Sequence, residues 1–274
     1  MRSGPRDVPE PVAVDFATLY DEHPEYVARR QPGSFEQAQV DIEVELFKLP
    51  HLLALLPSPN ALGNVVEIGC ATGELLAALP VAPGAPGVRR VGLDISAANV
   101  QAAQARFPSL EFICGDFRAL EPGAFDTVVM SDVLEHVPDA ASFLRDAAAL
   151  GATVLVNLPL EDNWLNRHRR YGPDDVSGHL RRYDLEDGLA LVQQAGLELL
   201  SWQRIWIHEG PAEVARRHLR SERQGAAFSG GRLQRTLRRF AFSLASGIRP
   251  LGRKMFASNL FFAARRPSRE GPLP

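Results

Sequence analysis

The 274-residue sequence contains only two cysteines, Cys70 and Cys114, so it has little material for disulfide bonds. Both lie in apolar runs, where we expect small buried thiols, and this scarcity predicts a reducing, cytoplasmic compartment. No apolar run approaches the roughly 18 residues of a membrane span, and the N-terminal MRSGPRDVPEP lacks a signal-peptide core. With 45% hydrophobic and 23% charged residues, the composition is that of a folded globular protein and excludes general disorder.

Short apolar segments alternate with segments of helical pattern through most of the chain. Strand signals, meaning brief runs of apolar and β-branched residues, occur at Asn64–Ile68, Arg90–Asp94, Leu110–Cys114, Asp126–Ser131, Thr153–Leu158, Leu200–Ile207 and Ser258–Ala264. Helical signals lie between most of them, as at Glu74–Leu79 and Leu185–Ala195. This alternation predicts an α/β fold with a doubly wound, mostly parallel seven-stranded sheet and helices on both faces. Ligands of such sheets bind at the carboxyl ends of the strands.

The regions outside this pattern predict the domain organisation. Apolar residues recur at helical spacing between Phe16 and Leu56, which predicts a helical cap. One apolar stripe of this region consists of Ile42, Leu46, Leu49 and Leu53. The predicted parts are a helical cap over 1–60, a sheet-containing core over 61–208, a basic helical insertion or lid over 209–256, and the last strand with a tail over 257–274. The terminal segments 1–11 and 267–274 are rich in proline, glycine and charge and predict frayed ends.

A glycine turn follows the first predicted strand. Gly69 and Gly73 stand four residues apart where the strand passes into a helix, which lets the backbone approach a ligand closely. The dinucleotide fingerprint G-x-G-x-x-G is missing, since Ala71 and Glu74 replace its second and third glycines. Glu74 would also repel a pyrophosphate, and no Walker-type lysine is present in the turn. These features disfavour nicotinamide dinucleotides and nucleoside triphosphates, whereas a cationic ligand would tolerate the acid.

Carboxylates follow the second and third predicted strands. Asp94 lies 21 residues beyond Gly73, the spacing at which a carboxylate accepts hydrogen bonds from both hydroxyls of a ribose. After the third strand, Asp116 and Phe117 provide a carboxylate and an aromatic ring where an adenine would lie. The sequence therefore predicts an adenosine site across the ends of these strands.

Four segments, in this order along the chain, resemble a known family. VVEIGCATGELL, VGLDIS, CGDF and FDTVVMSDVLEHVPD are similar to the successive motifs of class I S-adenosylmethionine-dependent methyltransferases, and the resemblance spans about residues 64–200. The segment Gly178–Asp184 also resembles the branch of the family that acts on small molecules and glycans. The chain departs from the usual pattern at Ala71, where the family commonly has glycine. The resemblance implies a Rossmann-like fold, S-adenosylmethionine as the cofactor and methyl transfer as the activity.

The resemblance also implies cofactor contacts for individual residues. Glu67 would steady the glycine loop or the amino group of the cofactor, and Gly69 and Gly73 would pass under its methionine part. Asp94 would hold the ribose. The remaining implied contacts are Asp116 with the adenine amino group, Phe117 with an adenine face, Ser131 and Asp132 beside the methyl-transfer site, and Ala71 and Ile95 along the cofactor.

Methyl transfer from a sulfonium is an in-line displacement with a good leaving group. Proximity and alignment therefore supply much of the catalysis, which can amount to roughly 7–11 kcal/mol of the barrier. A general base is needed when the acceptor is a hydroxyl or a protonated amine. His136, which follows the fourth strand, is the predicted base because histidine titrates near neutral pH. The alternative role for His136 is a hydrogen bond to the adjoining loop.

A 24-residue connection separates Leu158 from Tyr183. Long loops inside compact domains are commonly functional, and this one leaves the carboxyl end of the fifth strand, where it would border the acceptor pocket. Its five arginines suit phosphate, carboxylate or polar sugar groups. The predicted substrate-contacting residues are Trp164, Arg167, His168, Tyr171, His179, Arg181 and Tyr183. A merely solvated loop is the alternative.

The net charge is only −3, but it is unevenly distributed. Eleven basic residues and two glutamates lie between Pro211 and Phe256, a net of +9, so the remainder of the chain carries −12. Residues 231–248 place large apolar side chains on one side of a helical wheel and arginines on the other, the pattern of an interfacial membrane helix. Three roles stay open for the segment: a solvated lid helix, peripheral membrane contact, and nucleic-acid binding, for which no recognised module is present.

Together these features predict a cytoplasmic methyltransferase, with peripheral association at the inner face of a membrane as a further expectation. It would use S-adenosylmethionine to O-methylate a small or lipid-linked acceptor, with a sugar or other hydroxylated metabolite favoured. A quinone or isoprenoid-precursor methyltransferase at a membrane surface is one alternative, and a cofactor-binding scaffold without turnover is another. No metal site and no nucleic-acid partner are predicted, and the acceptor atom and oligomeric state stay open.

Overall fold

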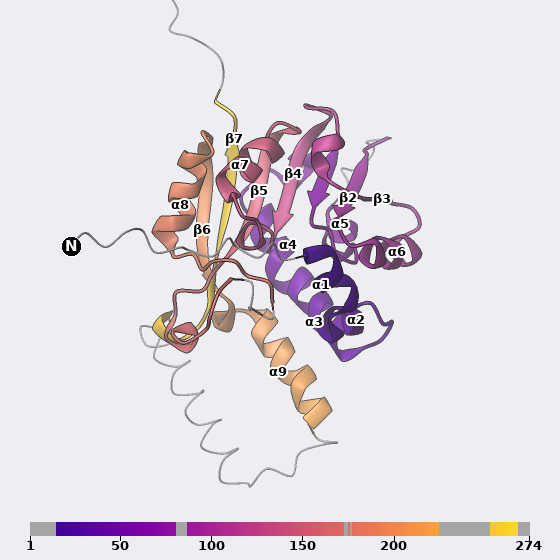
Figure 1. Ribbon diagram of the computed structural model, residues 1–274, viewed down its shortest axis with the longest axis vertical. Helices are drawn as coiled ribbons and strands as arrows, with labels where there is room; N and C mark the ends of the chain where they lie inside the picture. Colours follow the sequence, from indigo (N-terminus) through magenta and orange to yellow (C-terminus); the bar gives the residue numbers. More distant parts are fainter. Residues whose placement is uncertain (1–14, 81–86, 173–174, 176, 225–252, 268–274) are drawn as a thin grey trace, which may run out of the picture.

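The computed structural model describes residues 15–80, 87–172, 175, 177–224 and 253–267. Within this part of the chain, seven strands form one sheet in the order β3-β2-β1-β4-β5-β7-β6 (Figure 1). The strands are β1 (Val65–Ile68), β2 (Arg90–Asp94), β3 (Glu111–Cys114), β4 (Phe125–Ser131), β5 (Gly151–Leu160), β6 (Glu198–Trp206) and β7 (Ser258–Arg265). β1 to β5 pair in parallel, whereas β7 runs antiparallel to both β5 and β6. The predicted doubly wound, mostly parallel sheet is confirmed.

The strand order reverses beside β1. From β1 the chain moves outward through β2 to β3, and it then returns to the other side of β1 to form β4. Val66 of β1 therefore lies between Val91 of β2 and Val128 of β4. The connections that follow β1 and β4 lead in opposite directions, which leaves a crevice at the carboxyl ends of these two strands.

Helices cover both faces of the sheet. Those that follow the first strand are α5 (Glu74–Ala78), α6 (Ala97–Arg106), α7 (Ala140–Ala147), α8 (Leu185–Gln194) and α9 (Pro211–Gln224). Leu144 of α7 and Leu191 of α8 share a core with Val128 of β4. Leu76 of α5 shares a second core with Val129. Because successive strand residues point to opposite faces, the neighbours Val128 and Val129 belong to different cores.

The N-terminal cap lies at the carboxyl ends of the parallel strands. It consists of α1 (Phe16–Glu22), α2 (Pro24–Arg29), α3 (Phe35–Glu43), the π-helical turn η1 (Val44–Lys48) and α4 (Leu49–Leu53). In Figure 1, α1, α2 and α3 gather at the end of the sheet toward which β4 points. Asp21 of α1 accepts hydrogen bonds from the Ser96 hydroxyl and from the Ala98 backbone amide. These bonds attach the cap to the loop that follows β2.

The buried face of the cap lies beside the apolar stripe that the sequence shows. The predicted stripe is only partly buried against the core, and it comprises Ile42, Leu46, Leu49 and Leu53. The fully buried side chains are instead those of Val44, Phe47, Leu52 and Leu55. A π-helical turn holds more residues than an α-helical turn, so η1 rotates the inward face away from a regular helical period. The prediction of helix is confirmed, and the apolar stripe packs at the margin of the core, beside the buried residues.

Other predictions have separate outcomes. Cys70 is buried as predicted, but Cys114 is exposed, so the prediction for Cys114 is wrong. Cys114 ends β3, which is an edge strand and is open to solvent on its outer side. The predicted frayed segments, 1–11 and all but the first residue of 267–274, and the amphipathic segment 231–248 lie outside the described residues. None of the described helices is long and apolar enough to cross a membrane.

Phe47 joins the cap to the sheet, and its replacement tests this packing. The side chain is 1% exposed, and its ring meets that of Phe261 on β7 edge to face, with 5.4 Å between the ring centroids. We expect Phe47→Ala to lower the free energy of unfolding by about 3–5 kcal/mol, because loss of a buried ring leaves a cavity.

The control for this variant is Leu165→Ala, since the Leu165 side chain is 55% exposed. It should change the free energy of unfolding by about 0.5 kcal/mol or less. Urea unfolding of the full chain measures both variants. Equal effects would show that Phe47 does not anchor the cap.

Candidate functional site

The loop after β1 has a backbone conformation that favours small residues. Gly69 and Gly73 have φ angles of +76° and +85°, and Ala71 between them has +46°. All three values fall in the left-handed region, which glycine adopts without strain. A Cβ atom on Gly69 would come within 2.6 Å of a methyl carbon of Val133. The loop therefore passes close to the residues that follow β4 and forms a narrow cradle beside the strand ends.

Asp94, at the end of β2, holds this loop in place. Its Oδ2 accepts the backbone N–H of Ala71 at 2.8 Å, and its Oδ1 accepts that of Ser96 at 2.8 Å. Burial raises the pKa of Asp94 even though these hydrogen bonds favour the anion. Asn99 Nδ2 also donates to Oδ1, at 3.5 Å. Oδ2 keeps a further lone pair, and this is the acceptor that a ribose hydroxyl would use.

Glu67, at the end of β1, is a buried carboxyl group with an unused oxygen. The residue is 3% exposed, and within the described part of the chain its Oε2 has no hydrogen-bond partner. Burial raises the pKa of Glu67 well above its usual range, while the positive charge of Lys48 acts in the opposite direction. A buried polar atom without a partner is destabilising, so a ligand with a donor group, such as an amine, would be stabilised here.

Asp116 and Phe117 follow β3 at the other side of the site. The Asp116 carboxylate accepts the backbone N–H of Arg118 at 2.9 Å, and it forms an ion pair with the guanidinium of Arg118 at 3.2 Å. Phe117 is 3% exposed and packs edge to face on Phe143, with 4.8 Å between the ring centroids. Packing against Phe143 and the adjacent ion pair hold both residues at the end of β3.

One cavity of about 530 Å³ connects these strand ends, a volume within the roughly 300–1,000 Å³ of small-molecule sites. The predicted cofactor residues on its wall are Glu67, Gly69, Ala71, Asp94, Ile95, Asp116, Phe117, Ser131 and Asp132. Gly73 does not line the cavity; it directly precedes α5. Nine acidic side chains but only four arginines and lysines line the wall. A lining of this sign favours a cationic ligand, such as a sulfonium, over a polyanion.

A half-buried ion pair joins the cap to the end of β4. Lys48 Nζ lies 2.7 Å from the carboxylate of Asp132 and 3.4 Å from that of Glu43. Burial disfavours the charged lysine, yet the two carboxylates raise its pKa. Burial likewise opposes the ionisation of Asp132, but Lys48 outweighs this effect and lowers the pKa of the acid. Both groups are therefore charged, and Lys48 offsets part of the negative charge of the wall.

A chain of side-chain amides orients Ser131 and Asp132. Asn157 Nδ2 donates to Ser131 Oγ at 3.0 Å and to Asp132 Oδ1 at 3.1 Å. Asn259 Nδ2 in turn donates to Asn157 Oδ1 at 2.8 Å. Asp132 has a φ angle of +57°, a conformation that aspartate tolerates better than most residues. The amide chain crosses β7, β5 and β4, and it holds this strained residue at the cavity.

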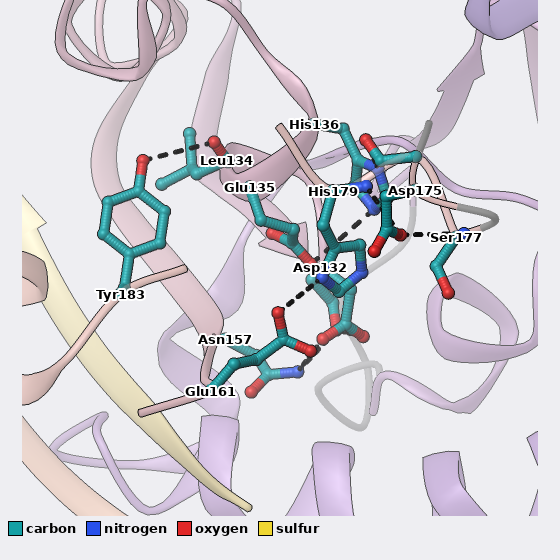
Figure 2. Close-up of polar contacts among 12 residues, drawn as sticks. Asp132, Leu134, Glu135, His136, Asn157, Glu161, Asp175, Ser177, His179 and Tyr183 are labelled. Carbon is teal, nitrogen blue, oxygen red and sulfur yellow. Dashed lines mark hydrogen bonds and ion pairs between the residues drawn. The ribbon is translucent and has the colours of Figure 1, made fainter. Parts of the chain in front are cut away.

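A second polar group, which we call the Glu135 cluster, consists of Glu135, His136 and His179 (Figure 2). Glu135 and His136 belong to the 3-10 turn η4 (Leu134–His136), and His179 comes from the loop after β5. Glu135 Oε1 is 3.7 Å from His136 Nε2, and the two imidazole rings lie edge to face with 4.7 Å between their centroids. All three residues line the cavity.

Burial governs the ionisation of His136 and Glu135. Burial, together with the nearby His179, lowers the pKa of His136 to about 4, so its imidazole is neutral at neutral pH. Burial, reinforced by the charge of Asp132, raises the pKa of Glu135 well above its usual range. His136 Nδ1 lies 3.1 Å from the carbonyl oxygen of Gly178. The hydrogen bond to the adjoining loop that the sequence left as an alternative is therefore present.

The structure brings one predicted substrate-contacting residue, His179, to the cavity wall. The six that do not line it are Trp164, Arg167, His168, Tyr171, Arg181 and Tyr183. Trp164 is 54% exposed, and the guanidinium carbon of Arg167 lies 3.9 Å from its ring centroid. Arg181 and Tyr183 donate to backbone carbonyls in or beside η4, at 3.1 and 3.4 Å. These two side chains hold the loop against η4.

Several residues of the site were not predicted from the sequence. The sequence has only two lysines, against 28 arginines, and Lys48 is one of them. Its position within an apolar helical segment is the signal that could have identified it. Glu135 directly precedes the predicted base. Phe16 and Tyr20 of α1 each lie edge to face with His136, at 6.0 Å between centroids. Nothing in their local pattern places them there.

Comparison of the sequence with known proteins matches methyltransferases. Residues 40–201 match a family model described as a methyltransferase domain. A ubiquinone biosynthesis O-methyltransferase from Albidiferax ferrireducens is 33% identical over 100 residues, which cover 34% of this chain and 38% of that protein. A trans-aconitate 2-methyltransferase from Paracidovorax citrulli is 41% identical over 116 residues, which cover 41% of this chain and 44% of that protein. The matches thus span less than half the length of these relatives.

Solved structures share the architecture at low sequence identity. Haemonchus contortus phosphoethanolamine N-methyltransferase 2, in complex with S-adenosylmethionine, has a TM-score of 0.59 and 17% identity; the match covers 94% of this chain and 61% of that one. The structure of magnesium protoporphyrin IX methyltransferase from Synechocystis, with the same cofactor bound, has a TM-score of 0.52 and 17% identity. That match covers 93% of this chain and 99% of that one. These structures agree with the present chain in fold.

Removal of one partner tests the weight of the half-buried Lys48–Asp132 pair. Lys48→Met leaves the charge of Asp132 unpaired, and because the Asp132 side chain is 30% exposed we expect the free energy of unfolding to fall by about 1–3 kcal/mol. Addition of Asp132→Asn removes that charge and should restore most of the loss, because asparagine tolerates the left-handed backbone. Chemical denaturation of both chains measures the difference.

The control uses an exposed ion pair of the same chain. Arg89 and Glu111 are 2.9 Å apart, with side chains 48% and 46% exposed. Arg89→Gln should cost about 1 kcal/mol or less. A double variant no more stable than Lys48→Met alone would argue against charge burial as the cause.

Proposed function

Because the chain belongs to the methyltransferase domain family and has the class I S-adenosylmethionine-dependent fold, we propose that it transfers the methyl group of S-adenosylmethionine to an oxygen of a small hydroxylated molecule. The predicted family and cofactor are confirmed by these matches. The observation that carries the proposal is the shared cavity. Its wall joins Glu67 and Asp94, on the predicted cofactor side, to Asp132 and His136.

The residues present fit the cofactor. When bound, S-adenosylmethionine supplies an electrophilic methyl group on a positively charged sulfur, which suits the acidic lining of the cavity. Asp94 would accept the ribose hydroxyls, and the unpartnered Oε2 of Glu67 would accept the amino group. The backbone at Gly69, which lines the cavity, would lie against the methionine part. Asp116 would contact the adenine amino group.

The acceptor would lie at the opposite end of the cavity, beside Asp132 and the Glu135 cluster. His136 stays the predicted residue for activating an acceptor hydroxyl. The carbonyl of Gly178 only accepts hydrogen bonds, so His136 Nδ1 carries the proton of the neutral ring and Nε2 has the lone pair. The loop arginines Arg167 and Arg181 do not line the cavity. Together with the acidic wall, this favours a neutral hydroxylated acceptor over one with several negative charges.

The names of the relatives favour a second candidate acceptor. Ubiquinone biosynthesis O-methyltransferases match this chain in sequence, which supports a phenolic quinone precursor with an isoprenoid tail, methylated at a membrane surface. Such an acceptor also presents a hydroxyl without a negative charge. Trp164 and Leu165 are 54% and 55% exposed after β5 and would suit an apolar surface. The predicted contact through 231–248, the cytoplasmic location and the scaffold alternative stay predictions.

The cofactor site is tested by calorimetric titration with S-adenosylhomocysteine. We expect micromolar binding to the wild-type chain and no binding of NADH. Asp94→Ala removes the proposed acceptor of the ribose hydroxyls and should weaken binding about 10-fold or more.

Asp162→Ala is the matched control for the cofactor titration. Asp162 is an acid outside the cavity lining whose side chain is 61% exposed, so its removal should leave the affinity unchanged. If the wild-type chain fails to bind S-adenosylhomocysteine, or if Asp94→Ala binds as tightly as wild type, the assigned cofactor site is wrong.

The role of His136 is tested by separating turnover from cofactor binding. Transfer of radiolabelled methyl from S-adenosylmethionine to a panel of phenols, quinols and sugars identifies an acceptor. With that acceptor, His136→Ala should lower turnover by about 100-fold or more while the affinity for S-adenosylhomocysteine stays unchanged. His218→Ala, at an exposed histidine of α9, should leave both unchanged. An undiminished rate in His136→Ala would remove His136 from the reaction.

A further inference from the structure

The Glu135 cluster has the composition and spacing of a metal site. One possible ligand atom from each of Glu135, His136 and His179 lies within 4.8 Å of the other two. Glu135 is only 1% exposed, yet within the described residues neither of its carboxylate oxygens has a hydrogen-bond partner. Burial of a carboxylate without partners is costly. A cation between the three side chains would supply the partner that Glu135 lacks.

Hydrogen bonds set both histidines in the form that metals bind. His136 Nδ1 lies 3.1 Å from the carbonyl oxygen of Gly178, and His179 Nδ1 lies 2.8 Å from Glu161 Oε2 (Figure 2). Both partners are acceptors, so each Nδ1 carries a proton, and Nε2 is the ring nitrogen that each histidine can offer to a metal. Metal-binding histidines commonly donate their second ring N–H to a carboxylate or a backbone carbonyl in this way.

Further charges hold His179 and Glu161 in position. Arg169 forms ion pairs with Glu161 and with Asp175, the latter at 2.7 Å. Asp175 Oδ1 also accepts the backbone N–H groups of Ser177 at 2.9 Å and of His179 at 3.3 Å. The long loop therefore carries an internal framework that ends at His179. This framework explains why arginine and acidic residues of the loop pair with one another instead of lining the cavity.

We propose that Glu135, His136 and His179 bind a divalent transition-metal ion of the zinc type, with its open coordination positions toward the cavity. Two imidazole nitrogens and one carboxylate are a ligand set of zinc sites that keep a position free for water or substrate. Zinc–ligand bonds of about 2.0–2.2 Å require ligand atoms somewhat closer together than 4.8 Å, so a modest inward shift would accompany binding. The site itself does not depend on the proposed function, whereas its role in the reaction does.

In that role, the ion activates the acceptor hydroxyl as a Lewis acid. The hydroxyl oxygen binds the metal, keeps the electron pair of its O–H bond and releases the proton to solvent. That pair then forms the bond to the transferred methyl carbon, while the pair of the breaking carbon–sulfur bond stays on sulfur. His136 thus acts on the hydroxyl through the metal.

The test is calorimetric titration of the untagged full chain with Zn²⁺ after removal of metal by a chelator. We expect one equivalent to bind, and Glu135→Gln and His179→Ala each to weaken binding about 10-fold or more. His218→Ala, at an exposed histidine, is the control and should bind as wild type does. Thermal unfolding gives a second readout, because Zn²⁺ should raise the Tm of the wild-type chain but not that of Glu135→Gln.

The outcomes separate this proposal from the proposed function. Without metal, Glu135→Gln should be at least as stable as the wild-type chain, because it removes a buried carboxylate that has no partner among the described residues. That stability would show that the variant loses Zn²⁺ binding without losing its fold. Absence of stoichiometric Zn²⁺ binding to the wild-type chain would overturn the metal site. So would Glu135→Gln and His179→Ala variants that bind Zn²⁺ as tightly as the wild-type chain. Titration of the same proteins with S-adenosylhomocysteine reports on the cofactor site alone.

Discussion

The ion pair between Lys48 and Asp132 is the contact on which the arrangement of the site depends. Lys48 belongs to the cap and Asp132 to the end of β4, and their charged atoms are 2.7 Å apart. Two partly desolvated charges stabilise each other only while they stay together, so the pair helps to fix where the cap lies over the sheet. Asn157, held by Asn259, binds the other side of Asp132. The cap and the strand ends thereby enclose a single cavity.

The sheet and the cofactor end of the site could be predicted because continuous segments encode them. The turn at Gly69 and the carboxylate of Asp94 directly follow strands, and such residues meet at one edge of a parallel sheet. The acceptor end is different, since Lys48, His136 and His179 come from three separate segments and meet only through tertiary packing. The loop arginines have suitable chemistry for an acceptor pocket, yet Arg169 pairs with acids of its own loop. Composition alone does not reveal such internal pairing.

Features that destabilise the folded chain concentrate in the cavity. Glu67 and Glu135 both line the cavity, and among the described residues each is buried with at least one carboxylate oxygen that has no hydrogen-bond partner. Asp132, which also lines the cavity, has a left-handed backbone. Natural proteins depart from good packing and full hydrogen bonding mainly at functional sites. Ligand binding would explain these departures together. The well-packed cores on the two faces of the sheet offset their cost in stability.

The match to the family model begins at residue 40, so α1 and α2 precede it. Phe16 and Tyr20 of α1 and Tyr26 of α2 nevertheless line the cavity, and the first two contact His136. The shared domain thus holds the residues proposed to contact the cofactor, whereas a segment outside it supplies part of the wall around the proposed acceptor. In evolutionary terms, the N-terminal helices would then be a separable determinant of substrate choice. Their exchange would let the same cofactor-binding framework diversify toward new acceptors without rebuilding its strand ends.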